Sequence, residues 1–208
     1  MEVPLVLVLL FFSVVLHEVS HGYVAYLNGD RTALAAGRLT LNPLAHIDLL
    51  GTVLIPLVLV LTRSPFLIGW AKPVPFDSRN FKNEKWGILT VALAGPLTNI
   101  LIACVFAALL RVTAPRQASA EIYYYGLSIN LLLALFNLFP LPPLDGSKAL
   151  SVFLPARLRR KFLSMDFLGF VVLFILLYTG IIHRLLLPAY QKLLDGFIGG
   201  PGAGGGGI

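Results

Sequence analysis

Four apolar segments limit what this chain can fold into. Each is close to the roughly 20 residues that a helix needs to cross a bilayer, and they cover residues 3–27, 87–110, about 123–139 and about 166–187. The composition agrees, because 57% of the 208 residues are apolar and 12% are charged, whereas a soluble domain has roughly 45–50% and 25%. Since backbone groups in lipid must pair within the protein, the spans are expected to be helical. The sequence predicts an all-α, multi-pass integral membrane protein with about four transmembrane helices.

Two shorter features complete the predicted fold. Residues 49–62 are apolar but number only 14 and include Pro56, and such a length fits a re-entrant or interfacial segment as well as a span. Residues 36–41 include GRLTL, whose alternation of apolar and polar side chains favours a short β element. The predicted architecture is therefore helical, with one short apolar insertion and one short strand.

Three ionisable residues interrupt the first apolar segment, in the sequence LHEVSHGY. His17 and His21 are four residues apart, so on a helix both imidazoles lie on one face and reach one zinc ion. Glu18 lies close enough to act as a base towards a zinc-activated water, as in other H-E-x-x-H sites. A solvated polar face is the ordinary alternative, but ionisable groups in a bilayer are costly unless they face a cavity and find partners.

A catalytic zinc site usually has three protein ligands, so one more is required. The candidates are His46, His183, Asp48, Asp145 and Asp166. Asp145 is the best placed, because it follows NLFPLPP, whose prolines end the helix and force extended backbone within membrane depth. An N-cap for the next helix is the alternative role for Asp145, and both roles are compatible.

The remaining composition excludes other classes of protein. Cys104 is the only cysteine, which rules out a disulfide within the chain and disfavours a cysteine metal site. The net charge of +6 comes without a basic aromatic patch, so no nucleic-acid partner is expected.

Three motifs together resemble the site-2 protease family of intramembrane zinc metalloproteases. They are HEVSHG, AGPLTN at residues 94–99 and NLFPLPPLDG at residues 137–146, in the order that the family has them. GRLTLNPLAHID is similar to a subgroup of small bacterial and archaeal members, and no PDZ-like insertion is present. AGPLTN by itself also fits small-residue helix packing with one interhelical hydrogen bond.

The resemblance implies a function and a site. It implies that His17, His21 and Asp145 bind one Zn²⁺ ion, that Glu18 is the catalytic base and that Asn137 helps to hold the substrate backbone. The implied activity is that of a zinc metalloendopeptidase, which hydrolyses peptide bonds in or near transmembrane segments of other membrane proteins. A catalytically silent metal-binding or chaperone-like relative is the alternative, and the intact Glu18 argues against it.

The expected organisation follows from these assignments. Residues 1–165 form the catalytic membrane core, residues 166–198 a C-terminal transmembrane helix with a short extension, and residues 199–208 a flexible Gly-rich tail. We expect a multi-pass protein of the cell membrane whose partners are the lipid bilayer and a membrane-protein substrate.

The metal site also constrains the topology. His17, His21 and Asp145 can meet only if the first and third spans run in the same direction, so residues 49–62 must not cross the membrane. Residues 28–86 and 140–165 then share one side and carry twelve of the sixteen Lys and Arg residues. The positive-inside rule makes this side cytoplasmic and places the active site towards the cytoplasmic half.

Overall fold

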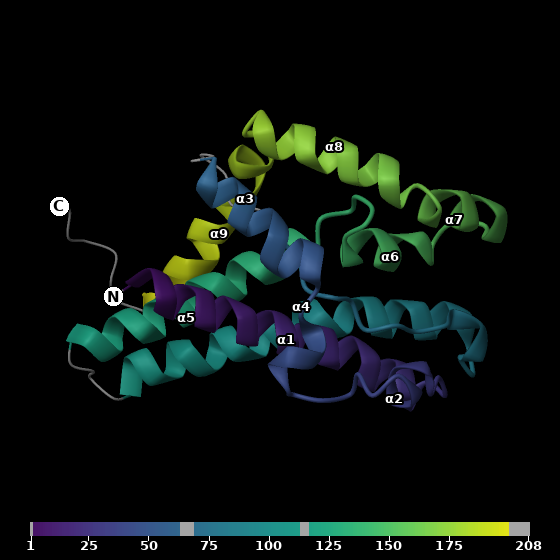
Figure 1. Cartoon of the computed structure of the whole chain (residues 1–208), viewed down its shortest axis with the longest axis horizontal. Coiled ribbons are helices and arrows are strands. Elements are labelled where there is room, and N and C mark those ends of the chain that lie inside the picture. Colours follow the sequence, from purple (N-terminus) through teal and green to yellow (C-terminus); the bar gives the residue numbers. More distant parts are fainter. Residues whose placement is uncertain (1, 63–68, 113–116, 200–208) are drawn as a thin grey trace.

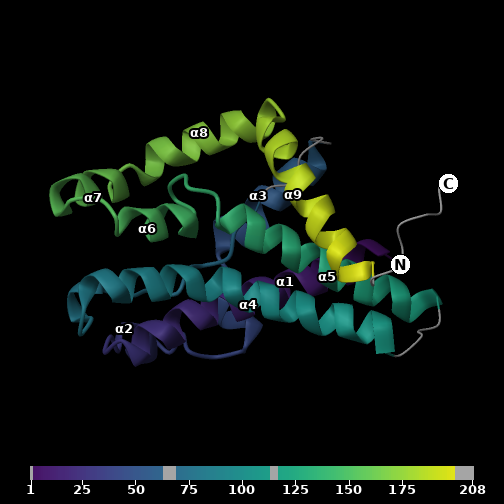
Figure 2. The ribbon, with the colours of Figure 1, turned by 180° about the vertical axis from the view of Figure 1, so that it is seen from behind.

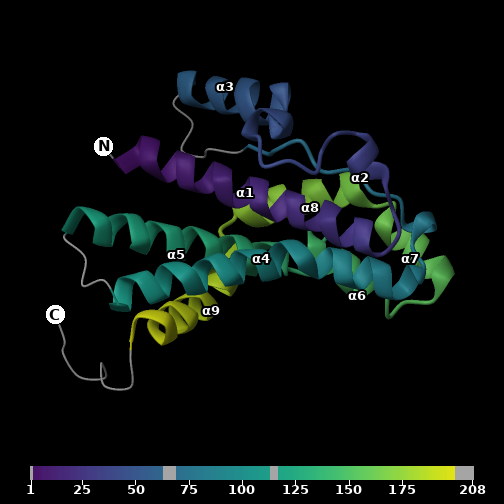
Figure 3. The ribbon, with the colours of Figure 1, turned by 90° about the horizontal axis from the view of Figure 1, so that it is seen from below.

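Three long helices form the centre of the structure, a computed structural model that describes residues 2–62, 69–112 and 117–199. They are α1 (Glu2–Leu27), α4 (Glu84–Val112) and α5 (Gln117–Asn137), and they lie side by side (Figures 1 and 3). Four further helices follow along the chain: α6 (Asp145–Ser151), α7 (Ala156–Leu163), α8 (Asp166–Tyr178) and α9 (Ile181–Ile198). The described part of the chain is therefore all-helical, as the sequence predicts.

Short elements make up the connection between α1 and α4. They are α2 (Thr32–Ala35), the 3₁₀ turn η1 (Pro43–His46), the π-helical turn η2 (Leu49–Leu54), α3 (Ile55–Leu61) and the 3₁₀ turn η3 (Ser78–Asn80). Seen from below, α3 lies on the opposite side of α1 from α5 (Figure 3). This connection supplies the loops that cover one end of α1.

The contacts of α1 fix the directions of the three central helices. Ser13 contacts Asn130 of α5, and further along α1 His17 contacts Asp145, which follows α5. The residue numbers of the contacting residues therefore increase together along both segments, so α1 and α5 are parallel. This is the arrangement that the predicted metal site requires.

The contacts of α1 with α4 run in the opposite order. His17 contacts Asn99, whereas His21, one turn later on α1, contacts Val91, which lies two turns earlier on α4. Helix α4 is thus antiparallel to α1 and returns the chain between the two parallel helices.

Two helices are long and apolar enough to cross a membrane, within the described residues: Pro4–Leu27 of α1 and Glu84–Val112. A third span is counted if α7 and α8, which are bent by 59° at their junction, are taken as one. Helix α5 does not pass the same criterion, and its first half carries polar residues, including Gln117 and Glu121. The structure supports two to three candidate spans, and the predicted number of about four is not confirmed.

The predicted single helix over residues 166–187 is wrong. Helix α8 ends at Tyr178, and Gly180 takes a left-handed conformation with φ of 72° before α9 begins. Gly180 adopts this conformation without the steric cost that a Cβ would add. Helix α9 then runs back along α5, where its Leu194 packs with Leu127 (Figure 2). Uniform apolarity concealed this break, because hydropathy does not register one glycine.

Residues 49–62 form a short excursion of the chain, and whether they cross a membrane stays a prediction. The apolar helical stretch Leu49–Leu61 is shorter than a span. The N–H of Trp70 donates to the carbonyl of Gly51, and the Thr52 hydroxyl donates to the carbonyl of Trp70. The chain therefore returns at residue 70 to the point that it left at residue 51.

The predicted short strand over residues 36–41 is not formed. Residues 36 and 37 are in a turn, and residues 38–42 follow as a loop without ladder pairing. A strand needs a partner, and within the described residues the N–H groups of Leu39 and Leu41 have no hydrogen-bond acceptor. The predicted Gly-rich tail lies almost wholly at residues 200–208, outside the described residues.

Candidate metal centre

The two histidines of α1 lie where α1 meets α4. His17 and His21 are one helical turn apart, and their exposed fractions are 5% and 6%. The opposite side of α1 presents apolar side chains such as Leu16 and Tyr23 to the exterior. The imidazoles are therefore turned into the protein.

Asp145 reaches the same place from the end of α5. After Asn137 the chain leaves the helix through a turn-rich segment with three prolines, and α6 begins at Asp145. A Cβ on Gly146 would overlap the backbone of Leu138 and Phe139, so glycine is required for α6 to begin this close to the end of α5. The cap position is Leu144 and makes no side-chain cap, so the Asp145 carboxylate is not an N-cap.

The three side chains form one compact cluster of donor atoms. Asp145 Oδ2 lies 3.1 Å from His17 Nε2 and 3.0 Å from His21 Nε2, and the two imidazole nitrogens are 3.0 Å apart. Four ligands at about 2.0–2.1 Å from a zinc ion would be roughly 3.3 Å apart in a tetrahedron. Two imidazoles and a carboxylate thus fit a three-ligand zinc site in type and spacing.

Helix α4 makes room for this cluster. A Cβ on Gly95 would overlap His17 and would lie 2.5 Å from His21 Nε2. Pro96 is fully buried within α4, cannot donate to the carbonyl one turn earlier and displaces that carbonyl. AGPLTN is therefore helix packing against α1, as the sequence allows, but it packs against the two imidazoles in particular.

Helix α4 also orients both rings through their other nitrogens. His17 Nδ1 donates to Asn99 Oδ1 at 2.6 Å, and His21 Nδ1 donates to the carbonyl of Val91 at 2.6 Å. Hydrogen bonds of this kind fix ring orientation in metal sites and leave Nε2 free for the metal. On the other side, Lys148 Nζ donates to Asp145 Oδ1 at 3.0 Å.

Glu18 is half-buried and lies outside the ligand cluster. Its Oε2 accepts a hydrogen bond of 2.9 Å from the N–H of Val74, in the loop before α4. Gly22, one turn further along α1, lies against the side chains of Val74 and Leu39. The loops 38–42 and 69–77 therefore meet over α1 beside Glu18, and the carboxylate keeps Oε1 for another partner.

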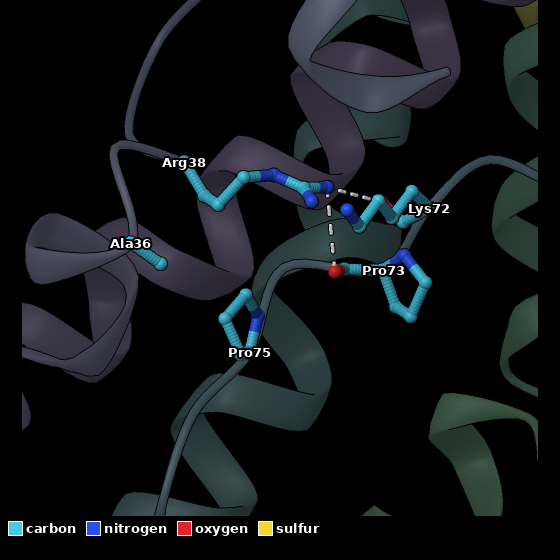
Figure 4. Close-up of a pocket in the computed structure, with 5 residues that line it drawn as sticks. All are labelled: Ala36, Arg38, Lys72, Pro73 and Pro75. Carbon is cyan, nitrogen blue, oxygen red and sulfur yellow. Dashed lines mark hydrogen bonds between the residues drawn. The ribbon is translucent and has the colours of Figure 1, made fainter. Parts of the chain in front are cut away.

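An open pocket lies along the same loops. It has a volume of about 330 Å³ and is lined by Ala36, Arg38, Lys72, Pro73 and Pro75 (Figure 4). Arg38 crosses it and donates to the carbonyls of Lys72 and Pro73, at 2.6 and 3.4 Å. These two hydrogen bonds hold loop 38–42 against the loop that carries Val74.

The other sequence candidates lie elsewhere. Asn137 is the last residue of α5, is half-buried and donates to the carbonyl of Leu133. His46 is fully buried in η1 and its Nε2 donates to the carbonyl of Thr40. Asp48 caps η2, while His183 and Asp166 are exposed. The cluster of possible ligands in the described residues contains none of these.

Comparison with known sequences identifies the family. The profile of peptidase family M50 matches residues 112–179. The Bacillus subtilis protein named "Putative zinc metalloprotease YwhC" is 37% identical over 204 residues, which cover 94% of this chain and 90% of that protein. The chain belongs to peptidase family M50, the site-2 proteases. This M50 chain is a zinc metalloprotease with apolar helices suited to a membrane.

Two further relatives of this M50 protease carry similar names. "Putative zinc metalloprotease Rip2" of Mycolicibacterium smegmatis is 26% identical over 176 residues, 83% of this chain and 66% of that one. "Putative zinc metalloprotease MJ0611" of Methanocaldococcus jannaschii is 48% identical over 60 residues, 29% and 31% of the two chains. No solved structure matches.

Sequence reasoning did not find the residues that support the cluster. No sequence motif identifies Val91, Asn130, Lys148 or Val74. The one available signal in the sequence was Asn99, an amide four residues after Gly95 on an apolar helix, which the structure buries fully. An amide on such a helix needs partners, and here its partners are His17 and Asn130.

Proposed function

We propose that this M50 protease cleaves peptide bonds in or near transmembrane segments of other membrane proteins, with its zinc held by His17, His21 and Asp145. The observation that carries the proposal is the cluster of two imidazole nitrogens and one carboxylate oxygen, 3.0–3.1 Å apart and buried between α1, α4 and the end of α5. A site that deep on apolar helices suits a substrate segment that also lies in the membrane.

Glu18 is the proposed base. When bound, zinc supplies a Lewis acid that polarises the scissile carbonyl and lowers the pKa of a water. Glu18 Oε1 takes a proton from the attacking water as the C–O bond forms, and the carboxyl group then gives it to the leaving amine as the C–N bond breaks. The Val74 N–H holds Oε2 during these transfers, so the carboxylate keeps a fixed orientation.

The substrate must be extended where it is cut, because the peptide bonds of a helix are enclosed by its own hydrogen bonds. Loop 38–42 offers the N–H groups of Leu39 and Leu41 for pairing, and Leu39 packs on Gly22 beside the site. A bound substrate would supply the missing partner of the predicted strand by strand addition. Asn137, at the end of α5, is the proposed further contact to the substrate backbone.

The proposed topology follows from the helix directions and the charges. Helices α1, α4, α5 and the apolar region of α7 to α9 cross the bilayer, whereas Leu49–Leu61 forms a re-entrant or interfacial hairpin. The loops around the cluster carry most of the basic residues, so they and the active site lie on the cytoplasmic side. Residues 1–165 then form the catalytic core and residues 166–198 its C-terminal cover.

Wild type, Glu18→Gln and Asp145→Ala test the proposal. The purified proteins are assayed for bound zinc and for cleavage of a model single-span substrate in lipid vesicles. We expect zinc in wild type and Glu18→Gln, cleavage by wild type alone with a loss of at least about 10²-fold in Glu18→Gln, and little zinc in Asp145→Ala. Bound zinc with cleavage by neither of the first two would favour a catalytically silent relative instead.

A further inference from the structure

A line of buried polar groups runs from His17 away from the metal cluster, across α4 and into α5. Asn99 Oδ1 faces His17 Nδ1, Asn99 Nδ2 donates to Asn130 Oδ1 at 2.8 Å, and Asn130 Nδ2 donates to the carbonyl of Gly126 at 2.8 Å. Both amides are fully buried, with exposed fractions of 0%. The Ser13 hydroxyl adds a side contact, 2.9 Å from Asn130 Nδ2.

At the Gly126 end of this line, the direction of hydrogen bonding is fixed. A backbone carbonyl only accepts, so Asn130 must turn its Nδ2 towards Gly126 and its Oδ1 towards Asn99. That oxygen also only accepts, so Asn99 must present Nδ2 to it and its own Oδ1 to His17. His17 must then carry its proton on Nδ1. Each orientation follows from the one before, because the reversed amide would place two acceptors against each other.

We propose that Asn130 is a positioning residue for the zinc site, which acts through Asn99 to hold His17 in the tautomer whose Nε2 is free to bind metal. The inference rests on the proposed role of His17 as a zinc ligand. His21 reaches the same state directly, because its Nδ1 faces the carbonyl of Val91. Within the described residues, His17 Nδ1 has no backbone carbonyl as its partner, so its proton is placed by the Gly126 carbonyl through the side chains of Asn130 and Asn99.

The inference separates Asn130 from its neighbours. The Ser13 hydroxyl can donate or accept, so it does not determine which atom of the Asn130 amide faces it. The Gly126 carbonyl still orients Asn130 when this hydroxyl is removed. Leu131 is next to Asn130 on α5, is also buried and lies in the apolar core between α4 and α5. Asn130→Leu should therefore weaken zinc binding, whereas Ser13→Ala and Leu131→Ala should not.

The test measures the zinc dissociation constant of the full chain in detergent by competition with a chelator, together with the thermal midpoint of the zinc-free protein. Loss of an outer hydrogen-bond partner typically costs 10–100-fold in metal affinity, so we expect about tenfold or more for Asn130→Leu. Ser13→Ala should stay within about twofold. Leu131→Ala should lower the midpoint and keep its zinc affinity. Asn130→Leu should cost no further affinity in an Asn99→Leu background.

Several outcomes would overturn the inference. Zinc affinity in Asn130→Leu equal to wild type does so, and so does a loss that adds in full to that of Asn99→Leu, since Asn130 would then act by another route. If the variant does not fold, zinc-free wild type with ¹⁵N-labelled histidine decides the matter, because no metal then fixes the tautomer. A His17 proton on Nδ1 supports the relay, and a neutral ring with its proton on Nε2 refutes it. Wild type that binds no zinc defeats the proposed function as well, which distinguishes the two failures.

Discussion

Gly95→Ala is the substitution whose effect the structure defines most closely. The added methyl group would overlap His17 and stand 2.5 Å from His21 Nε2, whereas ordinary contact begins at 3.4 Å. The His21 nitrogen would have to retreat by about 0.9 Å, several times the roughly 0.2 Å by which a zinc–ligand distance can depart from its normal value. Two of the three ligands would be displaced at once.

The expected result is a loss of zinc affinity of more than about 10²-fold, beyond the 10–100-fold that outer hydrogen bonds contribute. The fold should survive, because overpacking costs about 1–3 kcal/mol and alanine returns up to about 1 kcal/mol of helix propensity. Chelator competition on the purified full chain measures the affinity, and thermal unfolding of the zinc-free protein measures the stability.

Gly196→Ala is the matched control for this experiment. It makes the same change within α9, where the new methyl group meets nothing within 4 Å. Its zinc affinity should equal that of wild type. Gly95→Ala with wild-type affinity would show that the imidazoles do not lie against α4 at this point, and the geometry of the proposed site would be refuted.

Two other substitutions probe a partner of Asp145 and a buried carboxylate in the connection between α1 and α4. Lys148→Met removes the donor to Asp145 Oδ1 but leaves Oδ2 facing the histidines, so zinc affinity measured by chelator competition should fall by about 10–100-fold. A loss as complete as that of Asp145→Ala would contradict this role. Asp30 is buried, which by itself would raise its pKa, but hydrogen bonds from Thr32, Asn80 and the Asp77 N–H hold that pKa below its usual value. Its contribution is therefore present above pH about 4 and is lost as the pH falls below that value. Asp30→Asn should lower stability by about 2 kcal/mol at pH 7 and by much less at pH 3, as compared by thermal unfolding; an equal loss at both would contradict the assignment.

The cluster of His17, His21 and Asp145 could be predicted because each part of it follows from local rules. The four-residue spacing places His17 and His21 on one face of any helix, and the prolines before Asp145 end any helix that precedes them. Because the three side chains must meet, α1 and α5 must run in the same direction, and this requirement follows from the sequence alone. Those directions are the ones that the contacts of Ser13 and His17 show.

The errors arose where a single residue or an absent partner decides the structure. Gly180 breaks an apolar stretch that hydropathy treats as continuous, so one predicted helix is two. Residues 36–41 have an alternating sequence, but they have no neighbour to pair with, and alternation cannot supply one. The support from Asn130 was equally hidden, because one polar residue on a helix reveals a partner only when the adjacent helices are placed.

The polar groups at the site also hold the central helices together. In a membrane, helices gain little from apolar burial against each other, so small residues and interhelical hydrogen bonds determine their packing. Asn99 links α1 with α5 through α4, and Gly95 lets α4 approach the two imidazoles. The same contacts set the rotation of each helix and the orientation of the ligands. A change at this junction therefore acts on helix packing and on metal affinity together.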